Sequence, residues 1–396
     1  MTTTPFPSVP LVRNVRPWGG EASDIRIDEN GVITEIMPAA EHESAPGTVD
    51  GRGLLAIPGL INAHAHVDKS WWGHPWQSYG GEQSTEGRIR HERERRGELG
   101  IPSADITRAV LDQSVRTGTT AFRTHVDVDL GLGLDGISIV RDAFAQFDGA
   151  LGLQIVAFPQ DGVLRRPGVI DLLAQAAAAG VEFIGGLDPA AIDRDPVGQL
   201  DALFDIAAEH GCGIDIHLHD GGELGAFELE LIAERTERYG LQGRVNVAHG
   251  FAIVQIPESR RRDLLQTFGQ LDVTWSTVAP LRLPQLPLHE FAEARVDFAF
   301  GTDGIRDLWS PYGTGDLLGI AWQYARAGGV VRDEDLRRVV EIASSRAARF
   351  VGREVHDLVV GSRADIVLID AENPMDALVR TPPREIVIGG GRLLHA

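Results

Sequence analysis

Two histidines one residue apart, His64 and His66, are the first residues whose types and spacing could do chemistry. They follow an apolar run, 55–63, that has the character of a buried strand. Side chains alternate between the two faces of a strand, so both imidazoles lie on one face. There they can bind one metal ion at about 2.0–2.1 Å. Alone the pair is a weak signal, because histidines that are simply hydrogen-bonded in the core could give the same pattern.

Residues suited to metal binding or proton transfer recur where later apolar runs end. In chain order they are His125 and Asp127, Gln160 and Asp161, Asp188, His217 with His219 and Asp220, His249, and Asp303. In a barrel of parallel strands, the carboxyl ends of all strands converge on one mouth, where catalytic groups gather. Together with the first pair, these residues predict a single metal-dependent site.

Lys69 is the only lysine of the sequence, against 36 arginines. It lies three residues after His66, and arginine cannot imitate its compact, titratable ammonium group. Two interpretations remain open. Lys69 could donate a hydrogen bond to the substrate or to a developing negative charge, or it could form a salt bridge to Asp68 or a neighbouring acid.

Eight short apolar runs must position these residues, and segments with helical patterns separate them. The runs are 55–63, 120–126, 153–159, 181–187, 213–218, 244–248, 271–276 and 296–301. Ser103 can cap one of the helices, and Pro196 can begin another that stops at Gly211. Eightfold alternation of strand and helix predicts an α/β fold of the (β/α)8 TIM-barrel type.

The two ends of the chain have a different pattern. Residues 1–54 contain apolar alternation around an Asn30-Gly31 turn, which indicates a hairpin. Residues 357–396 contain two short apolar runs and a glycine-rich turn. We expect residues 1–54 and 357–396 to meet as one small β-sandwich domain, with residues 55–356 forming the catalytic barrel.

Composition narrows the functional class. The net charge of −20 argues against nucleic acid or an anionic membrane as a partner. The sequence has no run of 18 apolar residues, and its first ten residues do not resemble a signal peptide. A single cysteine excludes an intrachain disulfide. These features suit a cytoplasmic enzyme that acts on a small molecule, and it could form a homo-oligomer.

The sequence resembles the amidohydrolase superfamily and, within it, the cytosine deaminase group and its triazine-ring hydrolases, the N-isopropylammelide amidohydrolases. Motifs over nearly the whole chain carry the resemblance: 57–66 (IPGLINAHAH), 66–69 (HVDK), 123–127 (RTHVD), 156–160 (VAFPQ), 185–190 (GGLDPA), 217–220 (HLHD), 303–309 (DGIRDLW) and 361–367 (GSRADIV).

The resemblance implies a ligand set of His64, His66, His217 and Asp303, with His249 close to a metal-activated water and Gln160 against the substrate ring. Two-metal members carry a bridging lysine on the fourth strand. This sequence has none there, so we expect one metal ion. Three imidazoles and a carboxylate suit Zn²⁺ or Fe²⁺ equally.

Two positions depart from the cytosine deaminases. Asp220 stands where they carry a glutamate that moves protons to a ring nitrogen, and Gly304 stands where they carry a second acid. Asp220 and Asp303 could share the proton transfers that an amine-removing hydrolysis needs. Cytosine itself is therefore a less secure substrate than an amino-substituted triazine.

Further residues are assigned with alternatives. Asp188 is expected to hydrogen-bond a ligand histidine or the substrate, and Trp309 to stack on the substrate ring. His125 and Asp127 are expected to orient the site or to pack. His219 points opposite to His217 on a regular strand, so it is expected to support the ligands rather than to bind the metal. The insertion at 70–100 holds aromatic residues that could form a lid or a subunit contact, and its charged run, 88–96, is interpreted as a solvated helix face. The aromatic residues are Trp71, Trp72, Trp76 and Tyr79.

The leading functional prediction is a hydrolase that uses metal-activated water to remove ammonia or an alkylamine from an amino-substituted triazine or pyrimidine. A second enzyme class, ring opening of cyclic amides such as hydantoins, stays open. A third possibility is a non-catalytic barrel that serves in binding, and it predicts missing ligands.

Overall fold

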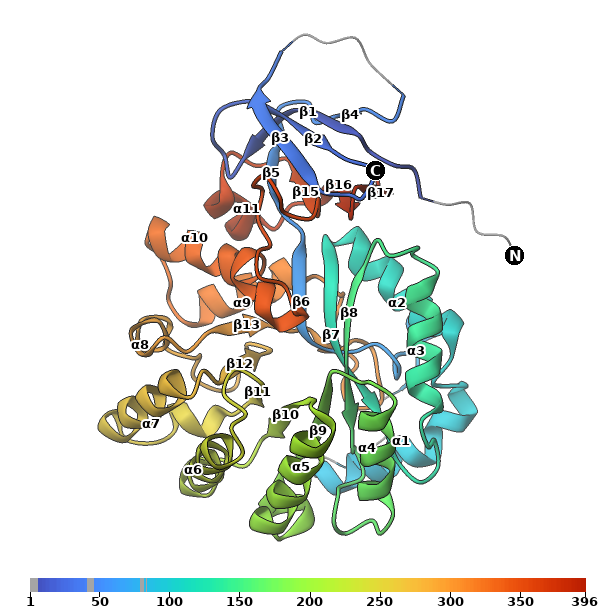
Figure 1. The fold of residues 1–396 in the computed structure, drawn as a ribbon, viewed down its shortest axis with the longest axis vertical. Coiled ribbons are helices and arrows are strands. Elements are labelled where there is room, and N and C mark those ends of the chain that lie inside the picture. Colours follow the sequence, from blue (N-terminus) through green and yellow to red (C-terminus); the bar gives the residue numbers. More distant parts are fainter. Residues whose placement is uncertain (1–5, 41–45, 79–81, 83) are drawn as a thin grey trace.

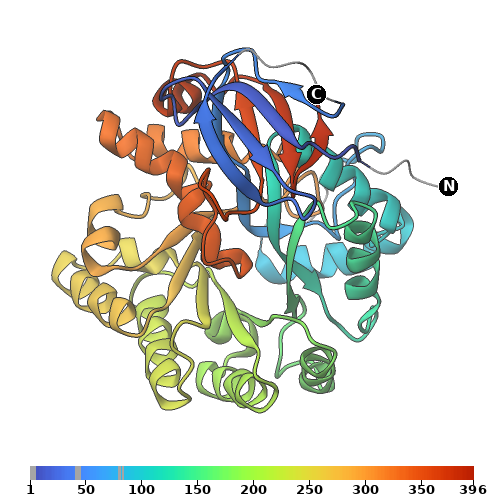
Figure 2. The same ribbon diagram turned by 45° about the horizontal axis from the view of Figure 1, so that its top comes forward.

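A computed structural model describes residues 6–40, 46–78, 82 and 84–396, so Tyr79 lies outside the described residues. Its centre is a ring of parallel strands in chain order (Figures 1 and 2). The strands are β6 (Leu60–His66), β7 (Thr119–Asp127), β8 (Gly152–Phe158), β9 (Phe183–Leu187), β10 (Gly213–Leu218), β11 (Val245–His249), β12 (Thr274–Thr277) and β13 (Phe298–Phe300). β13 pairs with β12, and β14 (Asp303–Gly304), just after it, pairs with β6, which closes the ring. The predicted α/β class is confirmed.

Helices surround the ring on its outer face (Figure 2). They are α2 (Ala104–Arg116), α3 (Asp135–Ala145), α4 (Val169–Ala178), α5 (Pro196–His210), α6 (Gly222–Arg238), α7 (Glu258–Gln270), α8 (Leu288–Ala294), α9 (Leu317–Ala327) and α10 (Asp333–Ile342). Two expected boundaries are confirmed: the Ser103 hydroxyl accepts the Ile106 N–H, and α5 runs from Pro196 to a left-handed Gly211. Among the described residues, every helix is too short or too polar to cross a membrane.

Strands from both ends of the chain form a second sheet at one end of the ring (Figure 1). It contains β1 (Leu11–Pro17), β2 (Ser23–Ile27), β3 (Ile33–Pro38), β4 (Val49–Asp50), β5 (Leu55–Pro58), β15 (Ile366–Ile369), β16 (Arg384–Gly389) and β17 (Arg392–His395), with α11 (Pro374–Arg380) beside them. Its buried apolar residues form a cluster of their own, drawn from both chain ends.

The prediction of a single strand over 55–63 is wrong. β5 pairs with β1 and β15 in the terminal sheet, whereas β6 belongs to the ring. Gly59 separates the two strands, and a Cβ there would lie 2.1 Å from the Thr120 hydroxyl oxygen. The apolar run continues through this crossing, so the sequence pattern does not reveal it. The domain boundary at residue 55 and the sandwich packing stay predictions.

Asp365, in the motif at 361–367, joins the terminal sheet to the ring. Its buried carboxylate accepts hydrogen bonds from Arg353 Nη1 at 2.6 Å, Arg363 Nε at 3.1 Å and the Gly390 N–H at 2.7 Å. Its carbonyl accepts the Gly59 N–H at 2.9 Å. The motif therefore fixes the crossing between β5 and β6. His64 and His66 lie at the far end of β6.

The insertion after β6 contains α1 (Thr85–Leu99), and its interpretation as a solvated helix face is wrong in part. Arg93 pairs with Asp161 at 2.8 Å, and Arg96 pairs with Asp129 at 2.5 Å. Glu92 is only 3% exposed. These partners follow β7 and β8, so one face of α1 is docked by charge on the end of the ring where the strands finish.

Candidate active site

Four imidazoles meet inside the ring at the carboxyl ends of three strands. His64 and His66 come from β6, His125 from β7 and His217 from β10. Each offers a nitrogen within 4.8 Å of the others, and all four residues are buried. Nε2 of His217 lies 3.3 Å from Nε2 of His66. The structure therefore brings together the three predicted histidine ligands.

Asp303 completes this group. Its Oδ1 lies 3.3 Å from Nε2 of His66 and 3.6 Å from Nε2 of His64. With His64 and His249 it forms a second set of donors within 4.8 Å of one another. Asp303 and His249 both have positive φ, 59° and 66°. Strain of this kind in non-glycine residues persists where the surrounding structure enforces it, which is common at functional sites.

The donor set fits a divalent metal ion. Among the described residues, Nδ1 and Nε2 of His64 and Nδ1 of His66 and of His217 are buried without a hydrogen-bond partner. Burial, which disfavours the imidazolium, lowers the pKa of His66, His217 and His249 well below the ordinary value. Neutral imidazoles are the form that a metal requires.

The local environment also keeps Asp303 ionised. Burial raises the pKa of its carboxyl, but the hydrogen-bonding contact with His64 and the electrostatic interactions with the neighbouring imidazoles outweigh burial and hold the pKa well below the ordinary value. A carboxylate beside neutral imidazoles is the combination that Zn²⁺ or Fe²⁺ sites use.

His125 is buried deeper than the sequence indicates. It is fully buried, and its ring centroid lies 4.3 Å from that of His64. Its Nε2 lies 3.4 Å from Oδ1 of Asp215, a buried carboxylate that Asn246 and Arg123 also contact. Sequence reasoning treated His125 as an orienting or packing residue and missed Asp215. The signal for both was inward direction, since Arg123 and His125 alternate along β7 and Asp215 and His217 alternate along β10.

Asp188 bonds a histidine outside the predicted ligand set. The backbone N–H of His219 donates to Asp188 Oδ1 at 2.5 Å, and Nδ1 of His219 lies 3.0 Å from Oδ2. Burial lowers the pKa of His219, but the Asp188 carboxylate outweighs it, so the net shift is upward. The His219 ring lies 4.3 Å from the His249 ring. This pair therefore offers a proton carrier beside the histidine cluster.

Asp220 contacts the π-helical segment η1 (Pro189–Asp193). Its Oδ2 accepts the Ala191 N–H at 3.0 Å. The buried Glu228 accepts the Ala190 N–H at 2.8 Å and interacts electrostatically with Asp220. Burial and the neighbouring Asp220 raise the pKa of Glu228 to about 8. Sequence reasoning missed Glu228, and the proton-transfer role of Asp220 stays a prediction.

Lys69 lies in a buried group of polar residues beside the histidines. Its ammonium donates to Asp127 Oδ1 at 2.6 Å and to Gln160 Oε1 at 2.8 Å, and lies 3.5 Å from Glu92 Oε1. The salt-bridge interpretation of Lys69 is therefore confirmed, with Asp127 as the nearest acid. Gln160, predicted to contact substrate, is its neighbour.

Trp309 closes this group from the other side. Its indole N–H donates to Glu92 Oε2, and its ring packs against a buried apolar cluster. The cluster consists of Ile89, Phe158, Leu187 and Ile192. Phe158 in turn stacks on His217, with ring centroids 4.1 Å apart. Trp309 therefore packs on the same apolar cluster as Phe158, and its role as a stacking partner for substrate stays a prediction.

The position of Gly304, where the cytosine deaminases carry an acid, is filled by another carboxylate. A Cβ at Gly304 would lie 1.6 Å from Oδ2 of Asp307. Oδ1 of the buried Asp307 accepts the Trp309 and Ser310 N–H groups, both at 2.8 Å. The acid expected at position 304 is therefore absent, but the Asp307 carboxylate occupies the space that its side chain would fill.

Comparisons with known proteins agree with this geometry. A model of the amidohydrolase family, Amidohydro_3, matches residues 47–395. The chain belongs to the amidohydrolase family.

The chain is also similar to solved and curated proteins. The crystal structure of N-isopropylammelide isopropylaminohydrolase from Burkholderia multivorans ATCC 17616 matches with a TM-score of 0.90 and 39% identity, over 97% of both chains. N-isopropylammelide isopropyl amidohydrolase from Pseudomonas sp. (strain ADP) is 28% identical over 360 residues, 87% of each chain. 5-Methylcytosine deaminase from Klebsiella pneumoniae shares the fold, with a TM-score of 0.81 at 24% identity, over 97% of this chain and 96% of that one.

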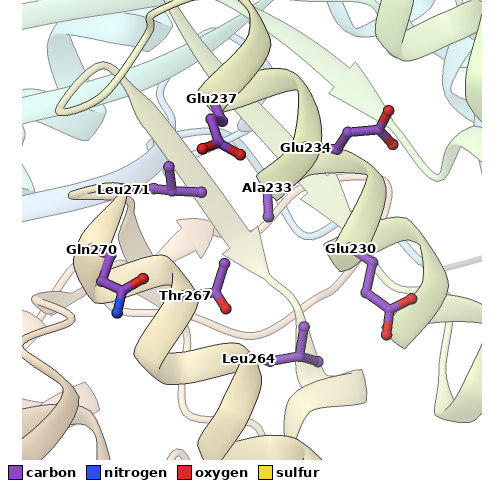
Figure 3. Close-up of a pocket in the computed structure, with 8 residues that line it drawn as sticks. All are labelled: Glu230, Ala233, Glu234, Glu237, Leu264, Thr267, Gln270 and Leu271. Carbon is purple, nitrogen blue, oxygen red and sulfur yellow. The ribbon is translucent and has the colours of Figure 1, made fainter.

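The amidohydrolase resemblance inferred from sequence is thus confirmed, and this amidohydrolase is an enzyme. A groove elsewhere on its surface, of about 270 Å³, lies between α6 and α7 (Figure 3). Three glutamates line it, Glu230, Glu234 and Glu237, and none of the predicted site residues does. The end of the ring that carries the histidines is therefore the candidate active site.

Proposed function

We propose that this amidohydrolase hydrolyses an amino-substituted N-heterocycle, a triazine or a pyrimidine, and releases ammonia or an alkylamine. The proposal includes one divalent ion, Zn²⁺ or Fe²⁺, and a (β/α)8 barrel with a small β-sandwich built from both chain ends. It also includes a cytoplasmic location. The relatives named for triazine and cytosine chemistry support the substrate class.

One observation carries the proposal: four buried imidazoles converge with Asp303, and several of their nitrogens have no partner among the described residues. Such nitrogens are costly unless a ligand satisfies them. His64, His66, His217 and Asp303 would hold the ion, and its chemistry would be Lewis-acid activation of water. His125 lies among these donors, so it either adds a further nitrogen or fixes the ring of His64.

The remaining residues supply binding and proton transfer. Asp303, ionised and half exposed, can take a proton from the attacking water. His219, held by Asp188, can carry a proton to a ring nitrogen or to the leaving amine. His249 lies between Asp303 and His219, because its ligand nitrogen is within 4.8 Å of an Asp303 oxygen and its ring is 4.3 Å from the His219 ring. Lys69 can donate to a ring carbonyl oxygen, and Trp309 can stack on the ring.

The competing enzyme reaction is ring opening of a cyclic amide. An amine-release screen with metal-loaded protein, read by mass spectrometry, separates the two. We expect ammonia or alkylamine in solution and a product whose ring is intact. A product that has gained the mass of one water, with no amine released, would support ring opening instead.

Two variants test the assigned residues and the non-catalytic alternative. Asp303→Ala should abolish amine release, and His217→Ala should lower the metal content per chain. Amine release at the wild-type rate by Asp303→Ala would remove Asp303 from the mechanism. A wild-type protein that holds no transition metal and gains no activity with Zn²⁺ or Fe²⁺ would favour a binding protein.

A further inference from the structure

Glu92 of α1 connects residues that are predicted to contact the substrate. Its Oε2 accepts the indole N–H of Trp309, and its Oε1 lies 3.5 Å from the ammonium of Lys69. Lys69 in turn donates to Gln160. Gln160, Lys69 and Trp309 are three independently predicted substrate contacts, and Glu92 ends the chain of contacts that joins them.

A structural role alone does not account for this placement. Glu92 is 3% exposed, whereas its neighbours Arg93 and Glu94 are exposed. Other ion pairs dock α1 without it, through Arg93 with Asp161 and Arg96 with Asp129. A buried charge is costly unless it is fully paired, so a carboxylate here requires a purpose beyond holding the helix.

The distances indicate which contact a ligand can replace. The Lys69–Asp127 and Lys69–Gln160 bonds measure 2.6 and 2.8 Å, whereas the Lys69–Glu92 distance of 3.5 Å is the longest of the three. A ligand whose edge lies against Lys69 and Glu92 would gain one hydrogen-bond donor, from Lys69, and one acceptor, from Glu92. That pair is complementary to a ring edge on which an N–H lies next to a carbonyl oxygen.

We propose that Glu92 is a specificity-determining residue, which accepts a ring N–H of the substrate while Lys69 donates to the adjacent ring carbonyl. The inference rests on the proposed function and narrows its substrate class to lactam-type aminoheterocycles. Rings that are N-alkylated at this edge lose the donor and leave the carboxylate unpaired, so the site rejects them.

Equilibrium binding to the metal-loaded protein tests the proposal without depending on turnover. The probes are N-isopropylammelide with its ring-N-methylated derivative, and cytosine with 1-methylcytosine. Wild type should bind the N–H ring at least about tenfold more tightly than its N-methyl partner, which is the range of one charge-assisted hydrogen bond. In Glu92→Gln this preference should fall to within about threefold, because the acceptor has lost its charge.

Two controls separate recognition from docking of α1. Glu94→Gln makes the same charge change on an exposed position of the same helix and should leave all dissociation constants unchanged. Arg93→Gln weakens docking without touching Lys69 or Trp309, and should weaken both members of each pair equally. An equal effect of Glu92→Gln on N–H and N-methyl rings would overturn the inference and leave only a structural role.

The result also separates this inference from the proposed function. Wild-type protein that binds and turns over the rings, with an unchanged preference in Glu92→Gln, contradicts the role of Glu92 alone. Wild-type protein that binds none of the four rings contradicts the proposed substrate class, and the inference falls with it.

Discussion

Burial and neighbouring charge decide what each side chain of the site can do. Burial lowers the pKa of His66, His217 and His249 and so favours their neutral forms, whereas Asp188 raises the pKa of His219 against the same effect and so favours its protonated form. Metal binding needs neutral imidazoles, and proton delivery needs a protonated one. Similar imidazoles within a few ångströms are thus assigned different tasks by their neighbours.

Lys69→Met should destabilise the protein as well as impair turnover. Asp127 and Glu92 would lose their buried counter-ion, a loss that costs about 3–5 kcal/mol. Burial and the neighbouring Glu92 outweigh the opposing effect of Lys69 and raise the pKa of Asp127 to about 8, so protonation should reduce the cost at acid pH. Urea unfolding at pH 8 and pH 5.5 measures the effect, with Arg262→Met, whose side chain is exposed and, among the described residues, pairs only with the exposed Glu258, as the control. A cost below about 1 kcal/mol at pH 8, far under the range for a broken buried pair, would contradict the buried ion pair.

Glu228 should make the protein less stable as the pH rises. Burial and Asp220 raise its pKa from 4.5 to about 8, so between these values the folded state holds more protons than the unfolded state. The free energy of unfolding therefore falls as pH increases through this window. Glu228→Gln mimics the protonated form and should flatten the dependence in thermal melts from pH 5 to pH 9. A slope equal to that of wild type would show that Glu228 is not the titrating group.

At the scale of elements, strands were easier to predict than the one helix that reaches the site. Apolar runs with polar ends give strand positions, because the code for a buried parallel strand is local. The inward face of α1 depends on Lys69, Asp129 and Asp161, which are distant in sequence, so its charged run resembles a solvated face. The Asp215 partner of His125 was missed for a similar reason, since it lies 90 residues further along the chain.

Gly301 tests how closely β13 and β6 must approach. A Cβ at this position would lie 2.4 Å from both Cβ and the carbonyl oxygen of His64. Gly301→Ala should therefore displace His64, lower the metal content and destabilise the fold by about 1–3 kcal/mol. Metal analysis and denaturant unfolding check both effects. Gly97→Ala, on α1 with no atom within 4 Å of the added Cβ, is the matched control. Normal metal content in Gly301→Ala would mean that the contact can relax.

At the scale of the whole molecule, the alternation of strands and helices predicts the parallel ring, and both chain ends predict a separate sheet. The sequence could not reveal the crossing at Gly59, because apolar residues continue on both sides of it. That crossing brings the terminal sheet, held by Asp365, to the amino-terminal end of β6. Residues at the ends of seven strands build the mouth of the ring. The terminal sheet supports the other end of β6, where that strand begins.

Titration of metal-free protein with Zn²⁺ or Fe²⁺, followed by amine release from an amino-substituted triazine, tests the central claim most directly. The arrangement of His64, His66, His217 and Asp303 predicts that activity rises in proportion to added metal and levels off at about one equivalent per chain. A break at about two equivalents per chain, or amine release that persists in the metal-free protein, would contradict it.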